Sequence, residues 1–318
     1  EASLSVLHNV QNYENATTMG RPGLNKKIVN SYLMADGSRF TDKAGYETMT
    51  FDQECQNRDP RLAQTIRTPG YTRIGSTKKE APNLAYTMTG YHLIKYSMTA
   101  NYDEYNKSCN DIPLFRTAEV YLNFAEAKAE LGTLKQADIN KSIKLLRDRV
   151  GMGNLDMELA NSKPDPYLMS AATGYPNVKG ANQGVILEIR RERTIELAME
   201  GFRYYDIMRW KEGKLFENDL LGIYIPGPGT YDLDQDGTDD VCFYVGTKPA
   251  GNVPLYLEIG EQIRLSNDES GYIICHSLIT KKWNEDRDYL YPVPISERTL
   301  SNGVVTQNPG WNDGLNFN

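Results

Sequence analysis

The sequence lacks the long apolar runs from which membrane-spanning helices are made. Crossing a bilayer takes about 20 consecutive, mostly apolar residues, and no run in this chain of 318 residues approaches that length. Hydrophobic residues nevertheless make up 40% of the composition, which is enough for a chain of this size to bury a large core without disulfides or metal ions. We therefore expect a soluble, globular chain.

The chain also has no excess of positive charge. Lys and Arg total 35 and Asp and Glu total 42, so the net charge is −7 and the pI is near 5.2. Nucleic-acid binding depends on clustered Lys and Arg against phosphates, and the short basic pair Lys78 and Lys79 is followed at once by Glu80. The composition therefore argues against a nucleic-acid partner.

Histidine and cysteine are both scarce. The three histidines are far apart and form no metal-ligand or catalytic-triad motif. The four cysteines form no C-x-x-C pair, which argues against a zinc site or a thioredoxin-type redox site, and we expect them to be buried free thiols. These residues are His8, His92, His276, Cys55, Cys109, Cys242 and Cys275.

Motifs of the common enzyme classes are missing as well. The chain contains no G-x-S-x-G elbow and no P-loop. Glycoside hydrolysis needs only two carboxylates, and Glu192, Glu196 and Glu200 share one helix face. Neighbouring arginines would lower their pKa, whereas a general acid needs a raised pKa. We therefore predict that the protein is not an enzyme and keep a glycoside hydrolase as the alternative.

Breaker residues divide the chain into three segments, which we interpret as parts of one domain covering residues 1–318. Gly and Pro interrupt residues 1–110, so we expect loops there, with a strand over 90–96. Residues 111–212 carry helical periodicity and form the scaffold. Residues 213–318 return to loops and short strands, including a strand at 272–275, and are expected to wrap over the helices.

The middle segment predicts a fold that is mainly α-helical. Residues 114–131 and 137–150 form a helix pair that resembles one tetratricopeptide-type unit, and 185–211 reads as one long helix. Such units need about three stacked copies to bury both faces. Because one copy is evident, we expect either a missing N-terminal portion or a partner surface, and a tetratricopeptide-type interaction scaffold is a second alternative function.

The long helix has charges and apolar residues at spacings of three and four. Oppositely charged residues at these spacings are neighbours on the helix surface, so we expect them to pair among themselves and to anchor the C-terminal wrap. They are Glu196, Glu200, Arg203, Asp206 and Arg209. Gly201 costs about 1 kcal/mol relative to Ala inside a helix, which predicts a local bend or a close contact there. The apolar face comprises Ile195, Ala198, Phe202, Tyr205 and Met208.

These charged residues and three other motifs resemble the SusD/RagB family of outer-membrane nutrient-binding lipoproteins of Bacteroidetes. The other motifs are residues 57–61 (NRDPR), 111–127 (DIPLFRTAEVYLNFAEA), and the pair 288–294 (DYLYPVP) with 306–311 (TQNPGW). The family's signature helix is matched at Arg193, Glu196, Leu197, Glu200, Gly201, Arg203, Asp206, Arg209 and Trp210.

The resemblance implies a SusD-like fold on a tetratricopeptide-type helical scaffold with loop-rich excursions. It implies a non-catalytic, cell-surface subunit that captures oligosaccharides for uptake through a SusC-like TonB-dependent transporter. It also implies the extracellular face of the outer membrane, with attachment through a lipid anchor outside this chain. The family's first helical repeats are not matched, so we expect this chain to be the C-terminal portion of a longer protein.

Loop tyrosines are the predicted glycan-binding residues. The composition includes 21 Tyr among the aromatic residues, and a tyrosine combines an apolar ring face with a hydrogen-bonding tip, which suits uncharged sugars. In this family aromatic residues on loops commonly build the sugar platform. The candidates in this chain are Tyr71, Tyr86, Tyr102 and Tyr105.

Residues 232–240 (DLDQDGTDD) match the opening of a calcium loop. Oxygen ligands alternate along the loop and Gly237 stands at the sharp turn, as hard Ca²⁺ requires. Phe243 occupies the twelfth position, where an EF-hand has a bidentate Glu, so we expect a structural calcium loop or a metal-free acidic hairpin, not a sensor hand. The predicted ligands are Asp232, Asp234, Asp236, Thr238 and Asp240.

Overall fold

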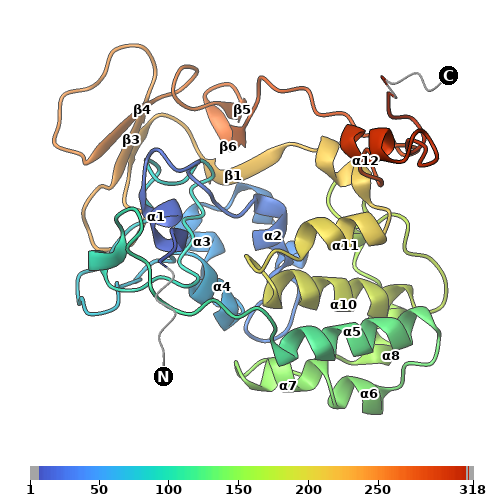
Figure 1. Ribbon diagram of the computed structural model, residues 1–318. Helices are drawn as coiled ribbons and strands as arrows, with labels where there is room; N and C mark the ends of the chain where they lie inside the picture. The colour runs from blue at the N-terminus through green and yellow to red at the C-terminus, as the bar shows by residue number, and fades with distance from the viewer. Residues whose placement is uncertain (1–6, 313, 315–318) are drawn as a thin grey trace.

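The computed structural model describes residues 7–312 and 314. Figure 1 shows two regions, with the strands gathered at the upper left and α5, α6, α7, α8 and α10 at the lower right. The helices are α1 (Val10–Asn15), α2 (Lys26–Ser31), α3 (Phe51–Glu54), α4 (Pro60–Thr65), α5 (Thr117–Glu130), α6 (Gln136–Asn140), α7 (Ile143–Asp148), α8 (Met157–Ser162), α9 (Pro166–Met169), α10 (Gln183–Glu196), α11 (Arg203–Arg209) and α12 (Ile295–Leu300). The short 3-10 turns are η1 (Phe40–Asp42), η2 (Tyr46–Thr48), η3 (Ala100–Tyr102) and η4 (Gly213–Glu217).

Two hydrophobic cores meet at α10. The first core lies between the helices near the start of the chain and the strands, and contains Tyr32, Phe51 and Phe243. The second lies among α5, α7, α8 and α10 and contains Leu122 and Ile143. Because Ile195 of α10 packs in the first core while the preceding turns of the helix pack in the second, α10 joins the two regions.

The strands form two small sheets. The first has the order β1-β6-β5 with antiparallel pairs, and in the second β3 pairs antiparallel with β2 and parallel with β4. Buried residues alternate with half-buried ones along β6, the period expected of a strand with one face on the core. The strands are β1 (Leu220–Ile225), β2 (Gly229–Tyr231), β3 (Val241–Tyr244), β4 (Leu255–Glu258), β5 (Leu265–Asn267) and β6 (Ser270–Cys275).

The strand prediction is right in one place and wrong in another. Residues 272–275 lie in β6 as predicted. The strand expected over 90–96 does not form, and only an isolated bridge joins Leu93 to Ile66 there. The backbone explains the failure, because Gly90 (φ 80°) and Tyr96 (φ 73°) both adopt the left-handed conformation, which ends an extended run at each side.

Of the two helices predicted in the middle segment, the first is confirmed and the second is divided into two shorter helices. α5 falls inside the predicted 114–131. The expected helix over 137–150 splits into α6 and α7 at Lys141 and Ser142. The Ser142 hydroxyl donates to the Asp138 carbonyl at 2.7 Å, so the side chain competes with the backbone for the helical hydrogen bond.

The long helix predicted over 185–211 is wrong, since it breaks into α10 and α11. Met199 (φ 64°) and Gly201 (φ 83°) take left-handed conformations between the two helices. Cations satisfy the carbonyl groups that the break releases, with Lys95 donating to Ala198 O at 2.8 Å and Arg116 to Glu196 O at 3.0 Å. The apolar face therefore ends early, and Tyr205 is exposed instead of buried.

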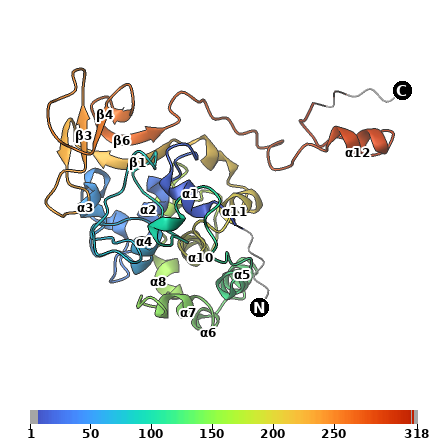
Figure 2. The same ribbon diagram turned by 60° about the vertical axis from the view of Figure 1, so that its left-hand side comes forward.

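The last part of the chain covers the helices only in part. Residues 283–291 lie against α11 and η4 through contacts between aromatic rings, but α12 stands out from the body of the protein in Figure 2. Among the described residues, no helix is both long and apolar enough to cross a bilayer.

The four cysteines are free thiols, as expected, but they are not all buried. Cys242 and Cys275 are buried and Cys55 is half-buried, whereas Cys109 is exposed. The expectation of burial is therefore wrong for Cys109, which lies in a loop just before the helical scaffold.

The contact between α8 and α10 is too close for any side chain at Gly184. A Cβ atom added there would lie 1.8 Å from the Ala160 carbonyl oxygen, and the adjacent Val185 N–H donates to the Asn161 side chain at 2.8 Å. We predict that Gly184→Ala lowers the melting temperature, because overpacking costs about 1–3 kcal/mol or more. Gly153→Ala is the matched control, since Gly153 has open space around it. Equal melting temperatures for the two variants would show that the contact is not as close as described.

Candidate functional site

The signature residues lie in a buried network of ion pairs around α10. The side chains of this helix are buried from Gly184 to Glu196. Desolvating a charge costs several kcal/mol unless partners compensate it, so each charged group must find partners on neighbouring elements. The buried charged residues of α10 are Glu188, Arg190, Arg191, Glu192, Arg193 and Glu196.

The turn at residues 57–61 supplies the first partner. Arg61 at the start of α4 donates to Glu192 Oε1 at 2.6 Å and lies 3.1 Å from Glu196 Oε2. Asp59 pairs with the other side of the same guanidinium at 2.7 Å and also caps α4 by accepting the Arg61 N–H. Arg147 of α7 completes the set at 2.8 Å from Glu192. Each oxygen of Glu192 therefore faces a guanidinium group.

The motif at residues 111–127 supplies further partners at the C-terminal end of the helix. Arg116 contacts Glu196 at 3.1 Å and Glu200 at 2.7 Å. Lys95 contacts Glu200 at 2.6 Å, and Arg149 contacts Glu196 at 2.9 Å. The two glutamates thus bridge the end of α10 to the loop before α5 and to the residues after α7.

The same motif also holds α11 against α10. Glu126 of α5 accepts from Arg209 at 2.7 Å and from the Trp210 indole N–H at 2.6 Å. Asp206 of α11 pairs with Arg193 of α10 at 2.8 Å and with Arg209 at 2.7 Å. The broken signature helix is therefore reconnected through its side chains.

The prediction that the signature charges pair among themselves is correct for Asp206 with Arg209 and wrong for the glutamates. Glu196 and Glu200 pair with cations from α4, α5, α7 and their loops, since α10 is too deeply buried for its charges to face solvent together. Arg203 donates to the Tyr175 hydroxyl at 2.8 Å and to the Thr194 hydroxyl at 3.0 Å, not to a carboxylate. These contacts are to helices and loops, not to the C-terminal wrap that they were expected to anchor.

Several partners were not predicted as functional or structural residues. Arg61 and Arg116 lie inside the quoted family motifs, so the motif match itself could have identified them. Nothing in the local sequence marks Lys95, Arg147 or Arg149, because their roles depend on where the chain returns in space.

Electrostatics follow from this pairing. Burial alone would raise the pKa of Glu192, but the charges of Arg61 and Arg147 outweigh it and hold the pKa at about 2. Glu14 shows the opposite balance, because burial dominates over its hydrogen bond from Ser97 and raises its pKa to about 8. Glu14 is fully buried, so its carboxyl group cannot contact a polysaccharide.

The four predicted glycan-binding tyrosines lie on loops of the first region. Tyr105 is 65% exposed, and the other three are half-buried. Tyr86 packs edge-on against the His92 ring at 6.1 Å, and the Arg67 guanidinium lies over the Tyr71 ring at 5.5 Å. Within the described chain, no ring contact joins any two of the four.

One arginine brings the loops of these tyrosines together. Arg73, two residues after Tyr71, is buried, donates to Met98 O at 2.6 Å and pairs with Asp103, the residue after Tyr102. The structure therefore places Tyr71 and Tyr102 on loops that contact each other through this ion pair.

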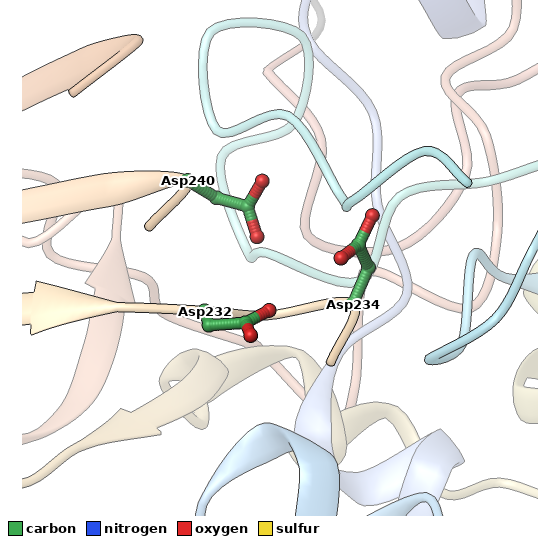
Figure 3. Close-up of side chains that lie close together, drawn as sticks. All are labelled: Asp232, Asp234 and Asp240. Atoms are coloured by element: carbon green, nitrogen blue, oxygen red, sulfur yellow. The ribbon is translucent and has the colours of Figure 1, made fainter. Parts of the chain in front are cut away.

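Three of the predicted metal ligands converge. Carboxylate oxygens of Asp232, Asp234 and Asp240 lie within 4.8 Å of one another between β2 and β3, as Figure 3 shows. Burial, together with the charges of the other two aspartates, raises the pKa of Asp240 to about 6, although a hydrogen bond from the Leu233 N–H opposes the rise. This mutual repulsion is what a bound cation would relieve.

The other two predicted ligands, Asp236 and Thr238, belong to the same loop and form hydrogen bonds within its turn. Asp236 accepts the Thr238 N–H at 2.8 Å, and Gly237 donates its N–H to Asp232 at 2.8 Å in a left-handed turn of φ 92°. The loop forms one wall of a cavity of about 480 Å³ whose opposite wall includes residues 78–85. Oxygen ligands of this kind fit a hard cation such as Ca²⁺.

Nearly the whole chain is similar to one protein family. Residues 6–311 match the model of the SusD family. A search of curated proteins finds no significant match.

Two solved structures share the fold. A SusD-like protein from Bacteroides fragilis is 22% identical, with a TM-score of 0.54 over 91% of this chain and 47% of its own length. A SusD-like carbohydrate binding protein from the same organism is 23% identical, with a TM-score of 0.54 over 87% of this chain and 47% of its own length. The mainly helical, SusD-like fold expected from the sequence is therefore confirmed, and the chain spans about half the length of these structures.

Removing the charge of Glu192 should expose the dependence of the fold on the network. We predict that Glu192→Gln lowers the free energy of unfolding by about 3–5 kcal/mol at pH 7, because buried Arg147 would lose the carboxylate it pairs with and buried Arg61 would lose one of its three. Urea unfolding measures this. Asp148→Asn is the control, since it breaks only the exposed pair with Lys144 and should cost about 0.5 kcal/mol or less.

The same variant should change the response to acid. The lowered pKa of Glu192 stabilises the folded protein fully above its ordinary pKa of 4.5, and this stabilisation is lost as the pH falls toward about 2. Wild type should therefore lose more stability than Glu192→Gln between pH 5 and pH 2. Parallel acid profiles for the two proteins would contradict the assignment.

Proposed function

The chain belongs to the SusD family, and on that basis we propose that it is a non-catalytic glycan-binding protein of the cell surface. One of its structural relatives is described as a carbohydrate binding protein. The proposal rests on the contrast between the buried charged residues of the signature and the tyrosines on the surface loops. The signature charges Arg193, Glu196 and Asp206 are buried in ion pairs, so we infer that ligand contacts fall to the tyrosines on the loops.

The loop tyrosines have the chemistry that sugar binding requires. A partly exposed ring offers a flat face to the C–H surface of a pyranose, while hydroxyl and amide groups nearby can bond the sugar hydroxyls. Asn83, Asn101 and Asn106 lie on the same loops as Tyr86, Tyr102 and Tyr105. We therefore assign Tyr71, Tyr86, Tyr102 and Tyr105 as one glycan-binding surface.

We further propose the cellular role that the family implies. The protein would hold oligosaccharides at the extracellular face of the outer membrane and pass them to a SusC-like TonB-dependent transporter. A lipid anchor outside this chain would attach it to the membrane. In this scheme α5, α6 and α7 form a tetratricopeptide-like unit of the helical scaffold.

The carboxylates argue against the alternative function, a glycoside hydrolase. Inside the network Glu192 stays ionised because its pKa is about 2, and a general acid must be protonated near neutral pH. Glu14 has a pKa raised to about 8, but its carboxyl group is buried away from any polymer. Release of reducing ends from a bound polysaccharide by the purified protein would overturn the non-catalytic assignment.

The aspartate loop carries a second proposal, that Asp232, Asp234 and Asp240 bind a structural Ca²⁺ ion. The convergence of their oxygens within 4.8 Å supports it. Gly237 provides the sharp turn, and Asp236 and Thr238 contribute to the same loop. Because Phe243 replaces the bidentate Glu of an EF-hand, we expect weak affinity, on the order of 10⁻⁴–10⁻³ M as in extracellular modules.

Replacing the four loop tyrosines tests the glycan-binding surface. We predict that the quadruple Tyr→Ala variant binds at least about 10-fold more weakly than wild type to a polysaccharide that wild type binds, because each stacked ring contributes about 0.5–1.5 kcal/mol. Affinity electrophoresis against plant, host and microbial glycans measures the change. The quadruple Tyr→Phe variant keeps the rings and should bind more tightly than the Ala variant, and equal binding by wild type and the Ala variant would eliminate this surface.

Calcium titration tests the metal site. We predict that protein freed of metal by a chelator releases or absorbs heat when titrated with millimolar calcium. Its melting temperature should be higher with calcium than without, and Asp234→Asn should lose both effects. Asp239→Asn is the matched control, since Asp239 is exposed in the same loop but outside the cluster. Absence of heat and of any thermal shift in wild type would refute the site.

The pH dependence of the metal site has a defined sign. Without metal, the raised pKa of Asp240 favours the folded state below its ordinary pKa of 3.8, and this contribution is lost as the pH rises through about 6. Calcium binds the ionised carboxylate, so the thermal shift caused by calcium should grow between pH 5 and pH 7.

A further inference from the structure

A second group of aromatic residues covers α11 at a distance from the loop tyrosines. The rings form a continuous chain of contacts with centroids 5.0–6.4 Å apart. Two come from α11, one from η4 and three from the segment between β6 and α12. We call this group the α11 platform, and it comprises Tyr204, Tyr205, Phe216, Trp283, Tyr289 and Tyr291.

Backbone contacts hold the platform in place. The Trp283 indole lies directly on Gly213, where an added Cβ would come within 2.0 Å of the ring. The Gly213 N–H donates to the Tyr289 hydroxyl at 2.9 Å, which in turn donates to Glu285 at 2.9 Å. The backbone N–H of Trp283 donates to Glu217 at 2.8 Å. Trp283 and Tyr289 are therefore held in place before any ligand arrives, which reduces the entropy lost on binding.

The platform remains open to solvent although its rings contact one another. Tyr205 is 64% exposed, Tyr291 is 66% exposed and Tyr204 is 37% exposed. Tyr204 also lines a cavity of about 230 Å³ that the break between α10 and α11 leaves, together with the polar side chains of Thr194 and Asp206. Exposed ring faces thus lie beside a hollow, as in small-molecule sites, and the Thr194 and Asp206 side chains that line it are bonded to Arg203 and Arg193.

The charges around the platform cancel. Residues 281–288 contain three cationic and three carboxylate side chains, and Lys214 pairs with Glu217 at 3.1 Å. The ring surface therefore attracts neither an anionic nor a cationic ligand over long range. Four of its six rings are tyrosines, whose hydroxyl groups can bond polar partners at the edge of the ring faces.

We propose that the α11 platform binds an uncharged oligosaccharide by stacking sugar rings on Tyr205, Tyr204 and Tyr291. This inference rests on the proposed glycan-binding function and adds to it a second surface and a ligand class. The surface is separate from the loop that contains η3, because the segment around residue 100, coloured teal, lies at the left of Figure 1 and α11 lies to the right of the centre. One glycan chain long enough to reach both surfaces would bind with an avidity that neither surface provides alone.

The test uses Tyr205→Ala combined with Tyr291→Ala, since both rings are exposed and their loss should leave the fold intact. Affinity electrophoresis is run in gels containing amylopectin, galactomannan, arabinoxylan or mixed-linkage glucan, with anionic homogalacturonan as the contrasting arm. The comparison uses the neutral polysaccharide that slows the migration of wild type, called the retained polysaccharide. We expect the double variant to bind it about 10-fold more weakly than wild type does. Tyr13→Ala, which removes an exposed ring from α1, should bind as wild type does, and matching melting temperatures confirm that all variants are folded.

A direct readout is available in the tryptophan of the platform. Oligosaccharides cut from the retained polysaccharide should change the fluorescence of wild type, and Trp283→Phe should lose most of that change. If wild type binds a neutral glycan and the double variant binds it equally well, the platform is overturned while the glycan-binding function stands. If wild type binds homogalacturonan alone, the platform is likewise overturned. If wild type binds no glycan in this panel or in the wider one, the function and the platform fall together.

Discussion

The rest of the structure depends on keeping the charges of α10 ionised inside the protein. Leaving one such charge without its partner costs about 3–5 kcal/mol, so α4, α5, α7 and α11 can occupy only positions from which their own charges reach the helix. Glu196 alone faces guanidinium groups from three separate parts of the chain, those of Arg61, Arg116 and Arg149. The network therefore determines how the two hydrophobic cores are placed relative to each other.

The chemistry of arginine explains why these positions are so specific. The Arg61 guanidinium holds both oxygens of Asp59 along one edge through Nε and Nη2, while Nη1 bonds Glu192, and the ammonium group of a lysine has no such planar, two-pronged edge. Arg116 likewise bonds two carboxylates and a backbone carbonyl group. Three motifs that are separate in the sequence are thus recognisable together because they are parts of one contact network in space.

The sequence predicted what local patterns control. Helix α5, strand β6 and the convergence of three aspartates follow from periodicity, alternation and the spacing of ligands along one loop. The bend expected at Gly201 is present, but its growth into a full break after Glu196 could not be predicted, because Lys95 and Arg116, which bond the released Glu196 carbonyl, are 101 and 80 residues away. For the same reason the partners of Glu192 and the ring chain of the α11 platform were missed, since each joins residues that only the fold brings together.

A division of labour follows from these energetics. A residue whose charge is buried and fully paired cannot be exchanged without leaving its partners unpaired, so the network can change little while the fold is kept. The exposed rings of Tyr105, Tyr205 and Tyr291 carry no such constraint, since their surfaces face solvent and their replacement leaves no buried charge behind. The residues that mark the family therefore maintain the scaffold, and under the proposed function the tyrosines on its surface are free to differ with the ligand.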